Sequence, residues 1–436
     1  MAATRNAPLP SGPRIFHAFT VAVFIALSTS TRGEDIEGVQ PAALDQPRIN
    51  LIVRRQAKGR PLSAKAGGEE TFNLEAFLDT GASGIVLSVH SADQLGIKRE
   101  TTAGAKPADA QFEDVGVGGG SRFGISEAVY LSMAAYTPNT NTENIDSVNL
   151  NYLQSAGPFR TQIGPLDTGN DLLASLVLGN LDIVGTPAMQ GKVMVMDTKE
   201  VNNMTDKIRT YLYDPKVKSN DGPGIPKTKR HIKLSYASFK EFTKTIPPSA
   251  EAPAVFANPF IGPNPLKPAG DATPPVIVTH KGRSSQGSWL LDTGAAASMI
   301  SRTQATAVGV NYTAGTFGTD HPTLDGVPAD QQFVMTVSGI GGAKKAAGFY
   351  LDKLALRMRE GQPLVYIRAP VLIADITVKN PATGREMTLD GVFGMNFLVA
   401  SCKIDESALL PDLDKLTPGA FRWIVYDQSA GLLGLE

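Results

Sequence analysis

The sequence predicts a mainly β fold made of two similar β-rich halves with few short helices. Short β-branched runs bounded by turn-forming residues recur along the chain, for example at residues 50–53 and 276–278. The 43 glycines and 30 prolines are scattered without a triplet period, which is typical of a chain with many turns. Long amphipathic stretches are few, and one apolar segment occurs twice in nearly the same form.

The N-terminal residues predict export. Residues 1–14 carry Arg5 and Arg14 but no acidic residue, and a mostly apolar run at residues 15–27 is followed by small polar residues. The run is shorter than the roughly 20 residues that a spanning helix needs. We therefore expect residues 1–33 to be a signal peptide and the mature protein to be secreted or periplasmic. An uncleaved signal that anchors the chain is the main alternative.

An internal duplication is visible in four pairs of segments that occur in the same order. The main pair is Phe-Leu-Asp-Thr-Gly-Ala at residues 77–82 and Leu-Leu-Asp-Thr-Gly-Ala at residues 290–295, which places Asp79 and Asp292 213 residues apart. The other pairs have offsets between 213 and 223; they are 116–119 with 339–342, 177–179 with 392–394, and 209–214 with 422–427. Four collinear pairs at a nearly constant offset indicate that one unit is used twice.

The domain boundaries follow from this repeat and from a proline-rich break. Residues 247–275 contain nine prolines, which lack the N–H that sheets and helices need, so we expect an extended linker there. The first lobe would then span residues 50–246 and the second residues 276–436. The short segment at residues 34–49 is interpreted as a frayed end, with a small prosegment as the alternative.

Each copy of the repeated segment predicts the same local structure. Apolar runs at residues 74–78 and 288–291 predict strands that lead directly into Asp-Thr-Gly. Helical patterns then follow at residues 91–95 and 304–308, and each ends at a glycine, as helices commonly do.

The paired aspartates are the main candidates for chemistry. A single Asp-Thr-Gly is best explained as a turn, and we interpret the third copy at residues 167–169 in this way because it follows no apolar strand. Two copies related by an internal repeat can face each other. Two carboxylates a few Å apart cannot both ionise easily, so they share a proton. One then acts as a general base that activates water, and the other as a general acid.

The residues beside the aspartates suit this task. The hydroxyls of Thr80 and Thr293 can bond to nearby backbone and fix the two turns. Gly81 and Gly294 allow backbone to approach the carboxylates and donate N–H groups to them.

These motifs resemble the pepsin and retropepsin superfamily of aspartic proteases. The resemblance rests on hydrophobic-Asp-Thr-Gly at Asp79 and Asp292 and on the later hydrophobic-hydrophobic-Gly at Gly179 and Gly394. It implies two pseudo-symmetric acid-protease lobes with a cleft between them and an aspartic endopeptidase whose substrate is a peptide or protein. It also implies a monomer, since both aspartates are in one chain, and no metal or organic cofactor. Four hairpin glycines resemble substrate-binding flaps, although a plain hairpin turn is an equal alternative; they are Gly118, Gly119, Gly341 and Gly342.

Two departures from the family are informative. Ala82 and Ala295 occupy positions where pepsins usually have Ser or Thr, whose hydroxyl would lower the pKa of the ionised carboxyl. We therefore expect the pair to titrate higher and activity to peak in weak acid. The single cysteine, Cys402, excludes the internal disulfides of secreted pepsins and any CxxC site.

Other functions have little support. The net charge of −1 predicts no binding to nucleic acid or to an anionic membrane. The five histidines show no metal-ligand spacing, no Gly-x-Ser-x-Gly frames a serine, and the glycines at 116–120 lack the last residue of a dinucleotide fingerprint. Two alternatives to an enzyme remain: a non-catalytic peptide-binding module, and an envelope structural protein with the same fold.

Overall fold

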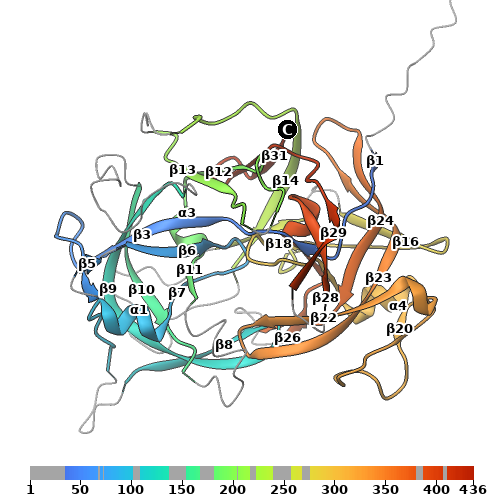
Figure 1. Ribbon diagram of the computed structural model, residues 1–436, viewed down its shortest axis with the longest axis horizontal. Helices are drawn as coiled ribbons and strands as arrows, with labels where there is room; N and C mark the ends of the chain where they lie inside the picture. Colours follow the sequence, from blue (N-terminus) through green and yellow to red (C-terminus); the bar gives the residue numbers. More distant parts are fainter. Residues whose placement is uncertain are drawn as a thin grey trace, which may run out of the picture. The chain divides into compact units, whose positions relative to one another are not determined.

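Strands dominate the computed structural model of the chain, in agreement with the predicted mainly β class (Figure 1). Only three short α-helices occur among the described residues. The described residues are 35–66, 69–71, 73–101, 109–136, 154–166, 181–203, 205–216, 222–238, 257–267, 275–379, 386–405 and 410–436. The predicted signal peptide, the third Asp-Thr-Gly at 167–169 and Gly179 lie outside them. Residues 33–436 belong to one compact unit, which contains both copies of the repeated segment.

The first Asp-Thr-Gly segment follows a central strand of a seven-stranded sheet. The strand order is β10-β7-β11-β6-β3-β9-β8, and the sheet closes because β10 also pairs with β9. These strands are β3 (Arg48–Arg54), β6 (Asn73–Leu78), β7 (Ile85–Leu87), β8 (Gln111–Gly116), β9 (Gly119–Ala134), β10 (Gln154–Ile163) and β11 (Asp182–Val184).

The second segment follows a central strand of a larger sheet. Its main path is β13-β12-β30-β31-β14-β15-β18-β27-β19-β24-β23-β16-β17, and β1 and β22 join it at β24 and β23. The strands are β1 (Asp35–Ile36), β12 (Val193–Asp197), β13 (Arg209–Tyr213), β14 (Arg230–Ala237), β15 (Asn258–Ile261), β16 (Val276–His280), β17 (Arg283–Gly287), β18 (Trp289–Leu291), β19 (Met299–Ile300), β22 (Gln332–Gly339), β23 (Gly342–Arg357), β24 (Pro363–Ile373), β27 (Gly391–Phe393), β30 (Trp423–Asp427) and β31 (Leu432–Leu435).

The two segments have the same strand pairings around them. In the first half β6 pairs parallel with β11, β11 antiparallel with β7, and β7 parallel with β10. In the second half β18 pairs parallel with β27, β27 antiparallel with β19, and β19 parallel with β24. Each Asp-Thr-Gly turn therefore begins at the end of a strand that has a hydrogen-bonded neighbour on both sides.

The predicted helices also occur in both halves. Helices α1 (Val89–Gln94) and α4 (Arg302–Ala307) start at Ser88 and Ser301, whose hydroxyls cap the first turn. The chain leaves both helices through a glycine with positive φ, as the sequence predicts. The remaining short elements are α3 (Thr186–Met189), η4 (Ala329–Gln331), η5 (Met395–Phe397), β2 (Ala42–Ala43), β4 (Ala64–Ala66), β5 (Glu69–Thr71), β20 (Asn311–Tyr312), β21 (Leu324–Asp325), β25 (Thr377–Lys379), β26 (Glu386–Thr388), β28 (Ser401–Asp405) and β29 (Leu410–Thr417).

The prediction of a frayed end at residues 34–49 is wrong. Strand β1 pairs with β24, and β2 pairs with β28. Two backbone bonds, from Ala43 N to Ala296 O (2.7 Å) and from Leu44 N to Ala400 O (2.8 Å), continue this attachment to the second half. The segment has no periodic pattern of its own because its partners are supplied by residues more than 250 positions away.

The proline-rich break is more than a linker. Residues 247–256 and 268–274 lie outside the described part, but β15 between them is a buried strand that pairs with β14 and β18. Pro259 is tolerated in this strand, and its register partner is Tyr236. The high proline content predicts only a linker, whereas the segment contains a strand whose Asn258 contacts the first Asp-Thr-Gly turn.

Two of the four repeat pairs correspond differently from the prediction. The residue that matches Gly394 in position is Gly185, not Gly179, because each follows the strand that pairs parallel with the Asp-Thr-Gly strand. Thr186 N donates to Ala82 O (2.9 Å) just as Met395 N donates to Ala295 O (2.8 Å). The segments at 209–214 and 422–427 are not equivalent, since β13 and β30 flank opposite sides of the same strand, β12.

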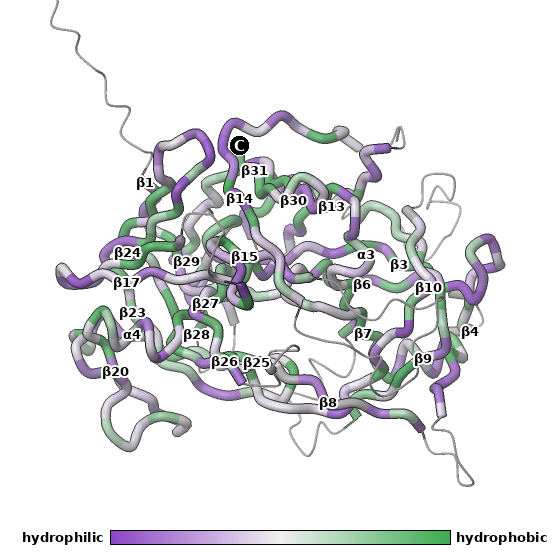
Figure 2. Tube along the Cα trace, turned by 180° about the vertical axis from the view of Figure 1, so that it is seen from behind, coloured by the Kyte–Doolittle hydropathy of each residue, from purple (hydrophilic) through white to green (hydrophobic). Residues whose placement is uncertain are grey.

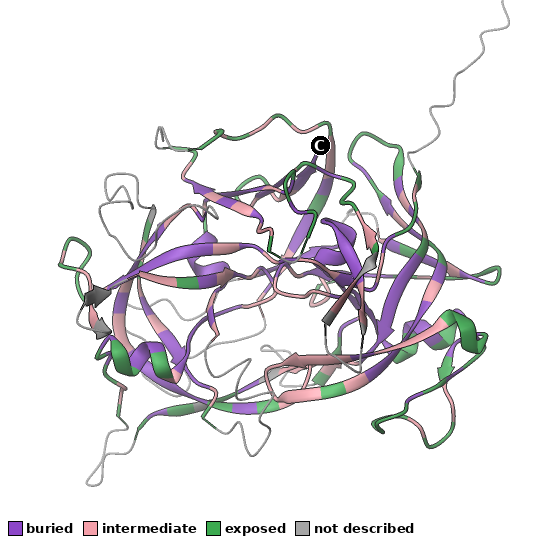
Figure 3. Ribbon diagram, viewed as in Figure 1, coloured by how far each residue is buried: buried purple, intermediate pink, exposed green. Residues whose placement is uncertain are grey.

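Many residues of the central strands are apolar (Figure 2) and buried (Figure 3), and they form one large apolar cluster. The largest fully buried side chains include Trp289, Phe393 and Phe397; Phe393 is the register partner of Leu291 and stacks on Phe397. Each such side chain contributes about 1.5–3 kcal/mol by burial. Cys402 is also fully buried, and burial raises the pKa of its thiol to about 11. None of the helices among the described residues has the length and apolar character required to cross a membrane.

Candidate active site

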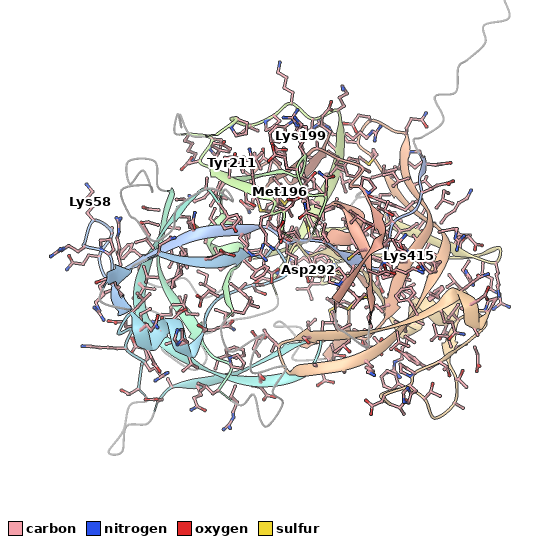
Figure 4. All side chains as sticks on the ribbon, viewed as in Figure 1. Lys58, Met196, Lys199, Tyr211, Asp292 and Lys415 are labelled. Atoms are coloured by element: carbon pink, nitrogen blue, oxygen red, sulfur yellow. The ribbon has the colours of Figure 1, made fainter. Side chains whose placement is uncertain are left out.

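The fold brings Asp79 and Asp292 together at the meeting point of the two Asp-Thr-Gly turns; Asp292 is labelled in Figure 4. The backbone of each turn lies against the carboxyl of the other. A Cβ on Gly81 would be 2.4 Å from Asp292 Cγ, and a Cβ on Gly294 would be 2.3 Å from Asp79 Cγ. Any larger residue would collide with the opposite carboxyl, which explains why glycine follows the threonine in both copies.

The threonines hold the two turns to each other through four hydrogen bonds. Thr80 N donates to Thr293 Oγ1 (3.0 Å), and Thr293 N donates to Thr80 Oγ1 (3.1 Å). The hydroxyl of Thr80 donates to Leu291 O (2.7 Å), and that of Thr293 donates to Leu78 O (2.6 Å). Both threonines are fully buried. Thr80 and Thr293 therefore join the two turns through bonds that cross between the halves, which is the geometry that their predicted supporting role requires.

Backbone N–H groups hold the carboxyls in place. Gly81 N and Ala82 N donate to Asp79 Oδ1 at 2.7 and 3.2 Å, and Gly294 N donates to Asp292 Oδ1 at 2.9 Å. These bonds fix one oxygen of each carboxyl and leave the other oxygens for the partner carboxyl and for a ligand.

Burial raises the pKa of both carboxyls. Desolvation is the main cause for Asp79, and it is partly offset by hydrogen bonds from Asp292 and from the backbone. Desolvation, followed by the charge of Asp79 and their shared hydrogen bond, raises the pKa of Asp292 well above its ordinary value of 3.8. The two carboxyls therefore titrate as one coupled pair, and their burial favours a state in which the pair holds a proton.

Two amide side chains that the sequence analysis missed support the turns from outside. Asn258 Nδ2 on β15 donates to Thr80 O (3.0 Å) and Gly81 O (2.9 Å), while its Oδ1 accepts from Ser83 Oγ (2.7 Å). Gln46 Nε2 donates to Gly294 O in a short hydrogen bond. Both residues belong to segments that are not repeated, so comparing the two halves could not find them. An asparagine beside a proline in an apolar stretch was the only local signal for Asn258.

A cavity of about 390 Å³ opens over the two aspartates. Its walls are mostly apolar, and both halves contribute to them. The apolar lining residues include Phe77, Val86, Ile183, Leu290, Met299, Met335 and Leu389. A largely apolar cavity with a few convergent polar groups is the usual form of a ligand site.

Two hairpins, β8–β9 and β22–β23, border the cavity and meet at their tips (Figure 1). Gly118 N donates to Ile340 O (2.9 Å), and a Cβ on Gly118 would be 2.4 Å from the backbone of Gly341. The predicted flap glycines, Gly118, Gly119, Gly341 and Gly342, therefore form the contact between the tips. Their neighbours Val117 and Ile340 line the cavity.

The polar groups that the candidate site offers are carboxylates, hydroxyls and amides. Among the residues that the structure describes, no three His, Cys, Asp or Glu side chains gather as ligands for an ion would. Comparison with known families finds no family model that matches the chain, and no curated protein matches it either.

Proposed function

We propose that the chain is an aspartic endopeptidase in which Asp79 and Asp292 activate a water molecule to hydrolyse a peptide bond. The observation that carries this proposal is the pair of Asp-Thr-Gly turns, joined by reciprocal threonine hydrogen bonds under a cavity. A structural protein has no need for two adjacent buried carboxyls whose pKa values are both raised. Burying two carboxyls costs free energy, and carboxyls with such perturbed pKa values are concentrated at catalytic sites.

The fold that this proposal implies is a pair of pseudo-symmetric acid-protease lobes. The matched strand pairings around β6 and β18 support it, as do the matched bonds of Thr186 and Met395 to the turns. The two hairpins that border the cavity are also equivalent in register, since Gly116 pairs with Gly119 and Gly339 with Gly342.

In the proposed mechanism, ionised Asp79 removes a proton from a water molecule while the water oxygen attacks the peptide carbonyl carbon. Asp292 donates its proton to the carbonyl oxygen, so that a neutral tetrahedral diol forms. The intermediate then collapses: Asp79 gives its proton to the amide nitrogen, the C–N bond breaks, and one diol hydroxyl returns its proton to Asp292. A carboxylic acid and an amine leave, and the pair is restored. The buried, backbone-bonded carboxyls are preorganised for these transfers.

The strands that border the cavity favour an extended peptide as the substrate. Strands β8 and β22 run along this border, and an extended peptide could pair with such strands through main-chain hydrogen bonds. The apolar walls would take side chains on both sides of the cleaved bond.

Incubation with an unfolded protein over a pH series, with and without a statine-type peptide, tests this function. We expect cleavage at internal peptide bonds that the statine-type peptide inhibits. A non-catalytic peptide-binding module predicts that the unfolded protein binds but stays intact. An envelope structural protein predicts neither binding nor cleavage at any pH, and either result would refute the proposal.

The pH dependence is a second expectation, and its sign follows from the raised pKa values. Activity needs one proton on the pair, so it falls below the lower pKa, where no base remains, and above the higher pKa, where no acid remains. Burial raises both pKa values, so the optimum should lie in weak acid. Ala82→Ser adds a hydroxyl beside Asp79 and should move the optimum to lower pH. A wild-type optimum in strong acid would contradict this expectation.

The contact between hairpin tips leads to a third prediction. Gly118→Ala places a methyl group 2.4 Å from the backbone of Gly341, which should separate the tips at a cost of about 1–3 kcal/mol. We expect kcat/KM for a peptide substrate to fall about tenfold. Gly339→Ala is the matched control, because its methyl would meet only Val117 Cβ at 3.7 Å. Equal losses in the two variants would show that the tip contact has no special role.

A further inference from the structure

The two sides of the cavity differ in polarity at equivalent positions of the two halves. Asp114 lies two residues before the end of β8, and Val337 lies two residues before the end of β22. Gln162 is the register partner of Val86 on β7, and Leu372 is the register partner of Met299 on β19. Val86 and Met299 each stand seven residues after their aspartate. The first half thus has a carboxylate and an amide where the second half has two apolar residues.

The polar pair belongs to the wall of the cavity. Gln162 Nε2 donates to Asp114 Oδ2 at 2.7 Å, and both residues line the cavity although each is only 2% exposed. The hydrogen bond from Gln162 fixes the orientation of the Asp114 carboxylate. Apolar residues beside the pair, including Val86 and Ile183, line the same side of the cavity.

The second-half side has no counterpart of this carboxylate among the described residues that line it. Val337 takes the place of Asp114, and it packs against the apolar cluster that contains Met299, Met335 and Leu389. An apolar side chain would be accommodated there, and a charged one would be left without a partner, which is costly in a buried site.

We propose that Asp114 determines specificity, and that the substrates are peptides with a lysine or arginine on one side of the cleaved bond and an apolar residue on the other. This inference rests on the proposed endopeptidase function. The long aliphatic stem of Lys or Arg packs against the apolar wall, and its cationic end meets the carboxylate of Asp114. The apolar residue occupies the side that contains Val337.

Cleavage-site profiling with a random peptide library tests the proposal. The wild-type protein should cleave peptides with Lys or Arg on one side of the bond at least about tenfold faster, by kcat/KM, than matched peptides with norleucine there. Asp114→Val, which copies Val337, should reverse this preference, and Asp114→Asn should remove it while keeping the shape. Thermal unfolding of each variant shows whether it is folded. If Asp114→Val is unfolded, Asp114→Asn still tests the proposal.

Glu113→Gln is the matched control, because Glu113 is the preceding residue of the same strand, is exposed and loses the same charge. It should leave the wild-type preference unchanged. A profile without a basic preference, or a basic preference that survives in both Asp114 variants, overturns the specificity proposal and leaves the endopeptidase proposal standing. Failure of the wild-type protein to cleave any peptide overturns both.

Discussion

Asp292→Asn is expected to reduce cleavage by at least about 10³-fold and, at neutral pH, to make the protein more stable. Activity is lost because asparagine cannot hold and donate the shared proton. Stability rises because the variant no longer needs to keep two buried acidic groups beside each other. Peptide hydrolysis and thermal unfolding of the same preparations measure the two effects.

The stability effect has a definite dependence on pH. The pKa of both carboxyls is raised in the folded protein, so above the ordinary value of 3.8 the unfolded chain releases protons that the folded pair still holds. The folded state therefore loses stability as pH rises from 3.8 through the raised pKa values, at about 1.4 kcal/mol for each unit of difference. The advantage of Asp292→Asn should appear in this range and disappear below it.

Asp320→Asn provides a matched control, since Asp320 is exposed and lies in the loop after β20. It removes one carboxylate from the surface and should change neither activity nor the pH dependence of unfolding. If Asp292→Asn retains wild-type cleavage, the proposed mechanism is wrong. If it is less stable than the wild type at every pH, the two carboxyls do not carry the burial cost that the structure assigns to them.

Thr80→Val is expected to destabilise the protein by about 2–6 kcal/mol and to reduce activity strongly. The substitution keeps the shape of the side chain but removes a hydroxyl that donates to Leu291 O and accepts from Thr293 N. Both partners are buried, and each unsatisfied group costs about 1–3 kcal/mol. The aspartates would then be held less firmly, so kcat should fall along with the free energy of unfolding. Urea denaturation and peptide hydrolysis measure these losses.

Thr80→Ser separates the hydroxyl from the rest of the side chain. Serine keeps both hydrogen bonds and loses one methyl group, so we expect a loss of only about 1 kcal/mol and nearly full activity. Similar losses for serine and valine would mean that packing of the methyl group, and not the bonds between the halves, stabilises the turns.

Much of the candidate site could be predicted from sequence because its determinants are local. Asp79 and Asp292 follow apolar strands, and their neighbouring threonines and glycines have roles that depend on backbone geometry within a few residues. The helices that start at Ser88 and Ser301 have caps and terminal glycines that are equally local. Repetition of the same pattern made each local signal stronger.

The parts that could not be predicted depend on contacts between distant segments. Strand β1 has no periodic pattern, and only pairing with β24 makes it a strand. Asn258 lies among prolines and acquires its role from the turn that it contacts. Gly179 agrees with the motif, whereas strand pairing places Gly185 at the position equivalent to Gly394. In each case the sequence contains the residue, but the partner that defines its role is far away along the chain.

Calorimetric titration of the purified protein with a statine-type peptide tests most directly whether Asp79 and Asp292 form one catalytic pair. The hydroxyl of such a peptide takes the place of the diol that the pair would hold. We expect one peptide to bind per wild-type chain, and we expect affinity to fall by at least about 100-fold in both Asp79→Asn and Asp292→Asn. Failure of the wild-type chain to bind, or equally tight binding by both asparagine variants, would contradict the proposed pair.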